Sequence, residues 1–95
     1  MAIKFCRKAI KFLEKANPED VENIREQIKK IFIAVEDQGI IPFTELDIKK
    51  RKGDWEEFYR LRIGKNRIIF TVDIDSKDIE IYAIGARGDV YKNNL

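Results

Sequence analysis

The chain has 95 residues, of which 44% are hydrophobic and 38% are charged, a composition typical of one small globular domain. Lys and Arg number 19 against 17 Asp and Glu, so the net charge of +2 by itself points to no class of partner. The sequence has no histidine and one cysteine, which excludes an internal disulfide, a histidine-based zinc site and a catalytic Ser-His or Cys-His pair.

Two amphipathic helices are predicted in the first part of the chain. After a short apolar start at residues 3–5, apolar residues recur at helical spacing within residues 6–16, which predicts a helix of about ten residues. Residues 17–20, Asn-Pro-Glu-Asp, begin a second helix, because Asn is a favoured N-cap, Pro suits the first helical position and acids favour the positive end of the helix dipole. Gly39 can end this helix. Its apolar stripe consists of Val21, Ile24, Ile28, Ile31, Phe32 and Val35.

A loop and a three-stranded meander follow the helices. Residues 39–54 contain Pro42, Gly53 and a basic run, Lys49, Lys50, Arg51 and Lys52, which indicates a connecting loop that can hold a short extended piece. Three stretches rich in β-branched and aromatic residues come next, at 55–63, 67–74 and 79–85. Turn-forming residues separate them, so we predict an antiparallel meander that the helical hairpin covers on one face.

The register of the first hairpin decides where its arginines point. With Lys65-Asn66 as a two-residue turn, Leu61 lies opposite Phe70. Because side chains alternate along a strand, one face is then apolar, formed by Leu61, Ile63, Ile68, Phe70 and Val72. Arg60, Arg62 and Arg67 all fall on the opposite, uncovered face. In the third strand we expect Ile81 and Ala83 on the core face, and Tyr82 and Ile84 beside the arginines.

The basic excess of the chain accompanies this hairpin. Residues 1–48 carry 8 basic and 9 acidic side chains, whereas residues 49–95 carry 11 basic and 8 acidic ones. Arg87 and Tyr91 follow the third strand and can join the cluster. Guanidinium groups hold phosphate oxygens, and arginine planes and tyrosine rings stack on unpaired bases. The pattern therefore predicts a surface for nucleic-acid phosphates and bases.

Ordinary structural roles are alternatives for each of these residues. Arginines at alternate positions also occur on a plain solvated strand face, here with Glu56, Glu57, Asp73 and Glu80 as partners. The basic run at 49–52 is either a solvated loop or a contact for nucleic acid or an acidic partner. Tyr91 can serve as a packing anchor, and Cys6 and Trp55 fit a core position better than a reactive or base-stacking one.

The order of these segments resembles the RelE/ParE family of bacterial and archaeal toxins from type II toxin-antitoxin pairs. A helical hairpin is followed by YRLRIGKNRIIFTV at 59–72 and IYAIGARGDVYKN at 81–93. The NRIIF strand is similar to the family's G-x-Y-R-[IV]-[IV]-Y strand, and IGARGDVY to its [IV]-G-H-R-x-x-[IV]-Y ending, with Ala86 in place of the histidine. The resemblance covers nearly the whole chain, so residues 1–95 form one domain of this kind.

The resemblance implies an α+β fold, a small twisted antiparallel sheet made of a short N-terminal strand and the meander, with a helical hairpin on one face. For the RelE branch it implies a ribosome-dependent endoribonuclease that cuts messenger RNA without metal or cofactor. The catalytic positions then carry Arg60, Arg62, Arg67, Arg87 and Tyr91. From its charge, the basic run Lys49, Lys50, Arg51 and Lys52 is expected to bind RNA. The implied partners are a cognate antitoxin, the ribosome and messenger RNA. No apolar run is long enough to span a membrane, and we expect a cytoplasmic protein.

One departure from the family pattern concerns the general base. The Lys-x-Lys pair of the best-known RelE branch is Arg60-x-Arg62 here, and an arginine that is always protonated is a poor base for a ribose hydroxyl. Lys49, Lys50 or Lys52 can fill this role, as can groups of the ribosome, or the reaction can run through orientation and charge neutralisation alone. ParE relatives share the fold and poison DNA gyrase, so a gyrase inhibitor or a catalytically silent antitoxin-binding protein is the alternative.

Overall fold

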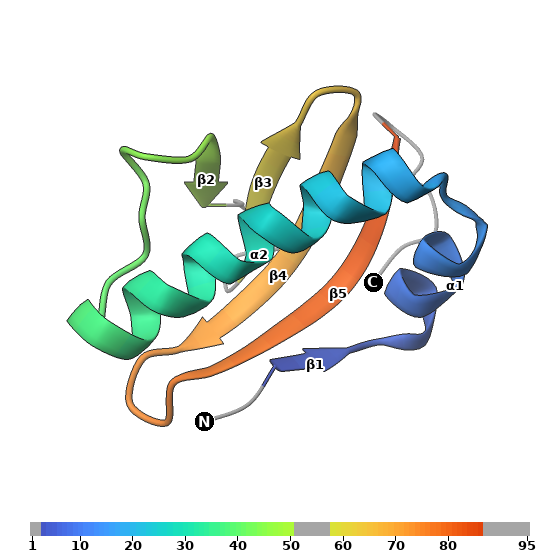
Figure 1. Cartoon of the computed structure of the whole chain (residues 1–95). Coiled ribbons are helices and arrows are strands. Elements are labelled where there is room, and N and C mark those ends of the chain that lie inside the picture. Colours follow the sequence, from blue (N-terminus) through green and yellow to red (C-terminus); the bar gives the residue numbers. More distant parts are fainter. Residues whose placement is uncertain (1–2, 51–57, 87–95) are drawn as a thin grey trace.

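The computed structural model describes residues 3–50 and 58–86 and has two helices on one face of a five-stranded sheet (Figure 1). In chain order the elements are β1 (Ile3–Phe5), α1 (Arg7–Lys15), α2 (Pro18–Gln38), β2 (Ile48–Lys50), β3 (Tyr59–Ile63), β4 (Asn66–Asp73) and β5 (Asp78–Ala86). The strand order in the sheet is β1-β5-β4-β3-β2. The predicted α+β fold with a helical layer on one face is confirmed.

Both helices begin and end close to the predicted residues. At the start of α2, the Asn17 side chain accepts a hydrogen bond of 2.8 Å from the Asp20 N–H, and Pro18 is the first helical residue. At its end, Gly39 takes a φ of +64°, a left-handed conformation that glycine adopts without steric cost. The two caps explain why a helix of 21 residues stops where it does and returns the chain toward the sheet.

The core lies between α2 and the sheet. The predicted stripe of α2 supplies four buried residues, Ile24, Ile28, Ile31 and Val35. They pack in one cluster with Ala9 of α1 and with strand residues that include Leu61, Ile68, Phe70, Ile79 and Ile81. Figure 1 shows α2 running diagonally across this face of the sheet, with α1 beside its N-terminal end. Because both helices occupy one face, the other face carries the remaining side chains of β3, β4 and β5.

The sheet differs from the prediction in the direction of one pairing and in having one additional strand. β1 pairs with β5 in parallel, so the sheet is mixed and not antiparallel throughout. The predicted extended piece in the loop is β2, which pairs with β3 through Ile48 opposite Leu61 and Lys49 opposite Arg60. This pairing brings a segment of the basic run onto the same sheet as the arginines.

The register predicted for the first hairpin is wrong by two residues. Gly64 and Lys65, and not Lys65 and Asn66, form the turn, so Ile63 lies opposite Asn66 and Leu61 opposite Ile68. Two-residue hairpins favour a positive φ at the first central position, and Gly64 has a φ of +55°. A shift of two residues preserves the alternation of faces, so the arginines stay on the face that the helices do not cover.

A β-bulge overturns two predicted orientations in the last strand. Ile69 lies opposite Ala83 but Phe70 lies opposite Ile81, so Tyr82 is an extra residue in β5. The extra residue reverses the alternation beyond it. Ile84 is therefore buried in the main core, and Ala83 packs with Ile69 on the other face.

Candidate nucleic-acid interface

Four basic side chains share one region of the helix-free side of the sheet. Arg60 lies opposite Lys49 and Arg62 lies opposite Arg67 in the strand register. Side chains directly opposite each other in an antiparallel pair stand about 4.5–5.5 Å apart at Cβ, and like charges in this arrangement repel. We call Lys49, Arg60, Arg62 and Arg67 the basic face. An anion bound to this face would reduce the repulsion between its positive charges.

The predicted exposure of this face is only partly correct. Arg60 and Arg67 retain 7% and 9% of their surface, so both are buried. Arg62 and Lys49 are exposed. A buried guanidinium is held in one orientation and loses less freedom when it binds a ligand, whereas the exposed side chains supply the first contacts with a charged partner.

Asp47 is the acidic partner that sequence reasoning missed. Its carboxylate lies between two arginines, with Oδ1 at 3.9 Å from Arg60 Nη2 and Oδ2 at 3.6 Å from Arg62 Nε. The Arg62 N–H also donates a 3.0 Å hydrogen bond to the Asp47 carbonyl, which extends the ladder of β2 and β3 by one residue. The pairing joins residues far apart in the chain, so only a correct pairing of β2 with β3 predicts it.

A basic hollow of about 450 Å³ lies at the turn end of this face. It is lined by Arg62, Gly64, Lys65, Arg67 and Ala86. Lys65 also lies within 3.9 Å of Asp20 at the start of α2, which ties the hairpin tip to the helical layer. Three cationic side chains around one concave surface make it suitable for phosphate groups.

The structure brings together some of the predicted site residues. Arg60, Arg62 and Arg67 lie on adjacent strands, and Lys49 joins them through β2. Lys50 is exposed and pairs with Tyr59 in the register, one position further along β2. The predictions for Arg51, Lys52, Arg87 and Tyr91 fall outside the described residues.

An aromatic pair lies on the same side of the sheet. The rings of Phe58 and Tyr82 meet edge to face with centroids 5.4 Å apart, and both pack on a small cluster formed by Ile69 and Ala83. Lys8 Nζ lies 6.0 Å from the centroid of the Tyr82 ring. Tyr82 therefore faces the arginine side, as predicted from the alternation of side chains after Ile81.

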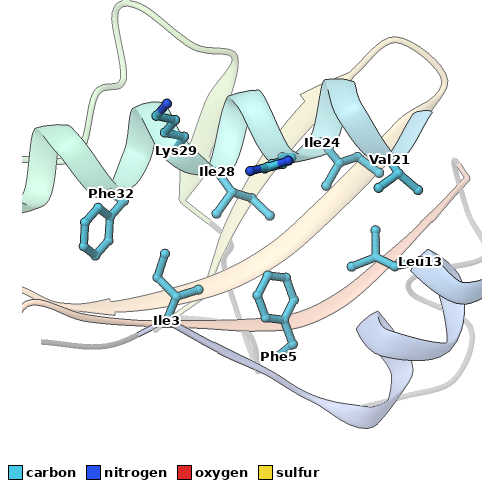
Figure 2. Close-up of a pocket in the computed structure, with 9 residues that line it drawn as sticks. Ile3, Phe5, Leu13, Val21, Ile24, Ile28, Lys29 and Phe32 are labelled. Atoms are coloured by element: carbon cyan, nitrogen blue, oxygen red, sulfur yellow. The ribbon is translucent and has the colours of Figure 1, made fainter. Parts of the chain in front are cut away.

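A second concave surface, the apolar groove, lies on the helical side. It has a volume of about 420 Å³ and is formed by side chains of β1, α1 and α2. Figure 2 shows Ile3 and Phe5 of β1 facing Ile28 and Phe32 of α2 across this groove. Arg25 and Lys29 of α2 also line it. The groove thus combines an apolar floor with two basic residues.

Cys6 does not belong to the basic face. It is half-buried at the start of α1, and its N–H donates to the Ile81 carbonyl of β5 at 2.9 Å. Burial raises the pKa of its thiol, and the neighbouring Glu80 carboxylate raises it further. The predicted packing role fits this environment, because a raised pKa keeps the thiol in its less reactive protonated form.

Two kinds of feature are absent from residues 3–50 and 58–86. No helix in this part of the chain is long and apolar enough to cross a membrane. The same residues contain no cluster of three or more His, Cys, Asp or Glu side chains that could hold a metal ion.

Comparison with known proteins identifies the family. Residues 2–91 match the model of the ParE toxin of the type II toxin-antitoxin system parDE. A Methanocaldococcus jannaschii protein named as a candidate RelE1 toxin is 32% identical over 91 residues, which cover 96% of this chain and 94% of the relative.

Solved structures of toxins have the same fold. The RelE-RelB complex of Pyrococcus horikoshii matches 93% of this chain and 96% of its own with a TM-score of 0.70 and 24% identity. The RelB-RelE antitoxin-toxin complex of Methanococcus jannaschii matches 94% and 95% with a TM-score of 0.65 and 27% identity. The YoeB/ParE toxin of Agrobacterium tumefaciens matches 92% and 99% with a TM-score of 0.71 and 18% identity. From the family model and the curated relative, we conclude that this chain belongs to the RelE/ParE family of toxins of type II toxin-antitoxin systems.

Proposed function

We propose that this toxin is a ribosome-dependent endoribonuclease that cleaves messenger RNA at its basic face and thereby stops translation. The observation that carries the proposal is the meeting of Arg60, Arg62 and Arg67 on adjacent strands beside a basic hollow. A protein that only had to stay soluble gains nothing from placing Arg62 directly opposite Arg67. A site that binds a phosphodiester gains a preorganised set of positive charges.

The chemistry that fits these groups is attack of a ribose 2′-hydroxyl on its own 3′-phosphate. The 2′-oxygen forms a bond to phosphorus and gives up its proton, the 5′-oxygen of the next nucleotide leaves and takes up a proton, and a 2′,3′-cyclic phosphate remains. Negative charge accumulates on the phosphorane oxygens during this step. Arginines held in place beside the phosphate stabilise that charge, and removing one such donor typically costs about a hundredfold to a thousandfold in rate. We assign this role to Arg60, Arg62, Arg67 and Arg87, with Tyr91 orienting or stacking on the substrate.

Dependence on the ribosome follows from the lack of an efficient base in the chain. The sequence has no histidine, and a protonated arginine cannot accept the 2′-hydroxyl proton. Lys49 shares a face with Arg60 and is one candidate for this role. Orientation of the message by the ribosome supplies the remaining acceleration in our proposal, because alignment for in-line attack alone can lower the barrier substantially. The isolated protein is therefore expected to cut free RNA poorly, and a chelator is not expected to change cleavage on ribosomes.

We also propose that a cognate antitoxin neutralises the protein. Support comes from structural neighbours that are toxin-antitoxin complexes. The apolar groove offers a place for an amphipathic antitoxin helix whose apolar stripe covers Ile28 and Phe32 and whose acidic residues meet Arg25 and Lys29. An acidic antitoxin segment can also cover the basic face directly, which would block the phosphate site. Ordering of a disordered segment on binding is compatible with either contact.

Inhibition of DNA gyrase is the second candidate function. The family model that matches residues 2–91 is that of ParE toxins, and the resemblance implies gyrase as the target of that branch. The replacement of the lysine pair by Arg60 and Arg62 also favours a role without cleavage. A protein that binds gyrase would not require the basic hollow to accept a phosphodiester.

Two assays run side by side distinguish these functions. The purified toxin is added to a reconstituted translation reaction and, separately, to a gyrase supercoiling reaction. We expect the toxin to stop translation and cleave the message in the first reaction, and to leave supercoiling unchanged in the second. Inhibited supercoiling together with an intact message would overturn it in favour of the second candidate.

A further inference from the structure

We propose that Asp47 is a built-in counter-ion that occupies the phosphate position between Arg60 and Arg62, and that the RNA phosphate displaces it on binding. The inference deepens the proposed function and rests on it, because it names a residue that regulates access to the same site. Asp47 is absent from the set of arginines and lysines that the sequence pattern singles out.

The geometry of the carboxylate resembles that of a bound anion. One oxygen lies 3.9 Å from Arg60 Nη2 and the other lies 3.6 Å from Arg62 Nε, so a single group bridges two guanidiniums. Register places Asp47 on this face, because its carbonyl accepts from the Arg62 N–H and Lys49, two residues later, lies opposite Arg60. A phosphate placed between the same two side chains meets the same pair of donors.

The contacts of the Asp47 carboxylate with the two arginines are long enough for a phosphate to displace it. Charge-assisted hydrogen bonds between a guanidinium and an oxyanion are about 2.7–2.9 Å long, and both contacts of Asp47 are longer than this. The side chains of Asp47 and Arg62 keep 45% and 50% of their surface exposed, so solvent screens the pair. A phosphodiester that forms short bonds to both arginines therefore replaces Asp47 at little cost.

Asp47 also pairs with a buried charge of the basic face in the free protein. Arg60 is buried, and a buried guanidinium is stable only with a charged or hydrogen-bonded partner. Asp47 supplies that partner while the site is empty of RNA. Since one negative charge already sits in the site, a nucleic-acid phosphate binds only if its contacts exceed those of the carboxylate, which lowers the affinity for stray anions.

Removal of the Asp47 charge tests the inference. The probe is a fluorescent 2′-O-methyl oligoribonucleotide, which cannot be cleaved because it has no free 2′-hydroxyl. Asp47→Asn keeps the size of the side chain, and Glu45→Gln removes an exposed charge from the same loop as a matched control. Asp47→Glu restores the charge and tests whether a conservative change rescues the wild-type behaviour.

Fluorescence anisotropy across a salt series gives the result. Asp47→Asn is expected to bind the probe roughly three- to tenfold more tightly than wild type at low salt, and to steepen the slope of log affinity against log salt by about 0.7, the value for one additional phosphate contact on a single strand. Glu45→Gln should stay within about twofold of wild type, and Asp47→Glu should resemble wild type.

Two results overturn the inference in distinguishable ways. If wild type binds the probe and Arg62→Ala weakens binding, but Asp47→Asn binds no more tightly, the counter-ion role is wrong and the RNA site stands. If wild type shows no salt-dependent binding and Arg62→Ala changes nothing, the RNA site itself is wrong and the inference falls with it.

Discussion

Arg62 of β3 lies directly opposite Arg67 of β4, so two guanidinium groups share one cross-strand position of a small sheet. Arg62 is half exposed and pairs with Asp47, whereas Arg67 is buried. Like charges directly opposite each other repel unless other groups pair with them, and both residues line the basic hollow. Arg62 is therefore the residue whose replacement should separate function from fold most clearly, because it is the half-exposed member of the pair.

Arg62→Ala should lower message cleavage by about a hundredfold to a thousandfold, because it removes a positive charge that we propose stabilises the phosphorane. Its thermal unfolding midpoint should stay close to that of wild type, since the side chain is half exposed and its ion pair contributes only about 0.2–1 kcal/mol. Arg25→Ala, on the exposed part of α2, is the matched control and should cleave like wild type. Equal activity of Arg62→Ala and Arg25→Ala would contradict the assignment.

Arg67→Ala should change the stability of the protein as well as its activity. The side chain is buried, so its loss should lower the unfolding midpoint as well as the activity. Arg67 lies on the face that the helices leave uncovered, as predicted, but its burial there was not predicted. Circular dichroism during heating separates the two effects.

Ala86→His should increase the rate of cleavage. Ala86 lines the basic hollow and stands where the family motif has histidine, so an imidazole there would lie beside Arg62 and Arg67 and could accept the 2′-hydroxyl proton. We expect a gain of at least about tenfold on ribosomes, with a rate that rises with pH through the titration of the new imidazole. Ala86→Gln, which adds bulk without a base, is the control. A variant no faster than this control would show that the base is not the missing element.

The reactivity of Cys6 should shift to high pH. Burial and then Glu80 raise the pKa of its thiol, so alkylation by iodoacetamide in the folded protein should have a midpoint above that of the urea-unfolded chain. Glu80→Gln should lower this midpoint only in part, because burial is the larger cause. Glu26→Gln on α2 should leave it unchanged.

The same shift sets the sign of a small effect of Cys6 on stability. The folded protein holds the thiol proton more tightly than the unfolded chain does. The contribution of the Cys6 thiol to the stability of the fold is therefore fully present below the pKa of the thiol in the unfolded chain. It is lost as pH rises through the pKa of the thiol in the folded protein. The free energy of unfolding in urea can be measured across this alkaline range for wild type and for a variant that lacks Cys6. A value that rises with pH in wild type but not in the variant would contradict the assigned direction.

Lys77 connects the turn between β4 and β5 to the end of α2. Its ammonium donates a 2.9 Å hydrogen bond to the Glu36 carbonyl, and its φ of +62° is strained for a residue with a Cβ. Lys77→Ala should lose the bond and keep the strain, whereas Lys77→Gly loses the bond and relieves it. Urea unfolding should find Lys77→Ala less stable than Lys77→Gly by about 1 kcal/mol. The opposite order would mean that the left-handed conformation costs nothing here.

Local signals in the sequence predicted the helices well. Asn17, Pro18 and Gly39 act through their own backbone neighbours, so the bounds of α2 could be inferred without knowledge of the fold. The alternation of apolar residues in β3 and β4 likewise fixed which face the arginines occupy. The exact register was missed because placing the turn depended on recognising that Gly64, and not Lys65, takes the first turn position.

Features that depend on distant pairing were not predictable in this way. The bulge at Tyr82 changes the orientation of Ala83 and Ile84 only because β5 pairs with β4 around it. The Asp47 contacts require β2 to lie beside β3, and the burial of Arg60 and Arg67 is a property of the assembled sheet. The sequence thus predicted which face Arg60, Arg62 and Arg67 share, but not the acid that pairs with Arg60 and Arg62.

Mapping of 5′ ends on a translated message after exposure to the toxin tests the central claim most directly. In a reconstituted translation reaction, primer extension should detect new ends within the translated region with wild type, few with Arg62→Ala and none when ribosomes are omitted, and a chelator added after ribosome assembly should not remove them. Intact message with wild type, or equal cleavage by wild type and Arg62→Ala, would contradict the account of the basic face as an RNA-cleaving site.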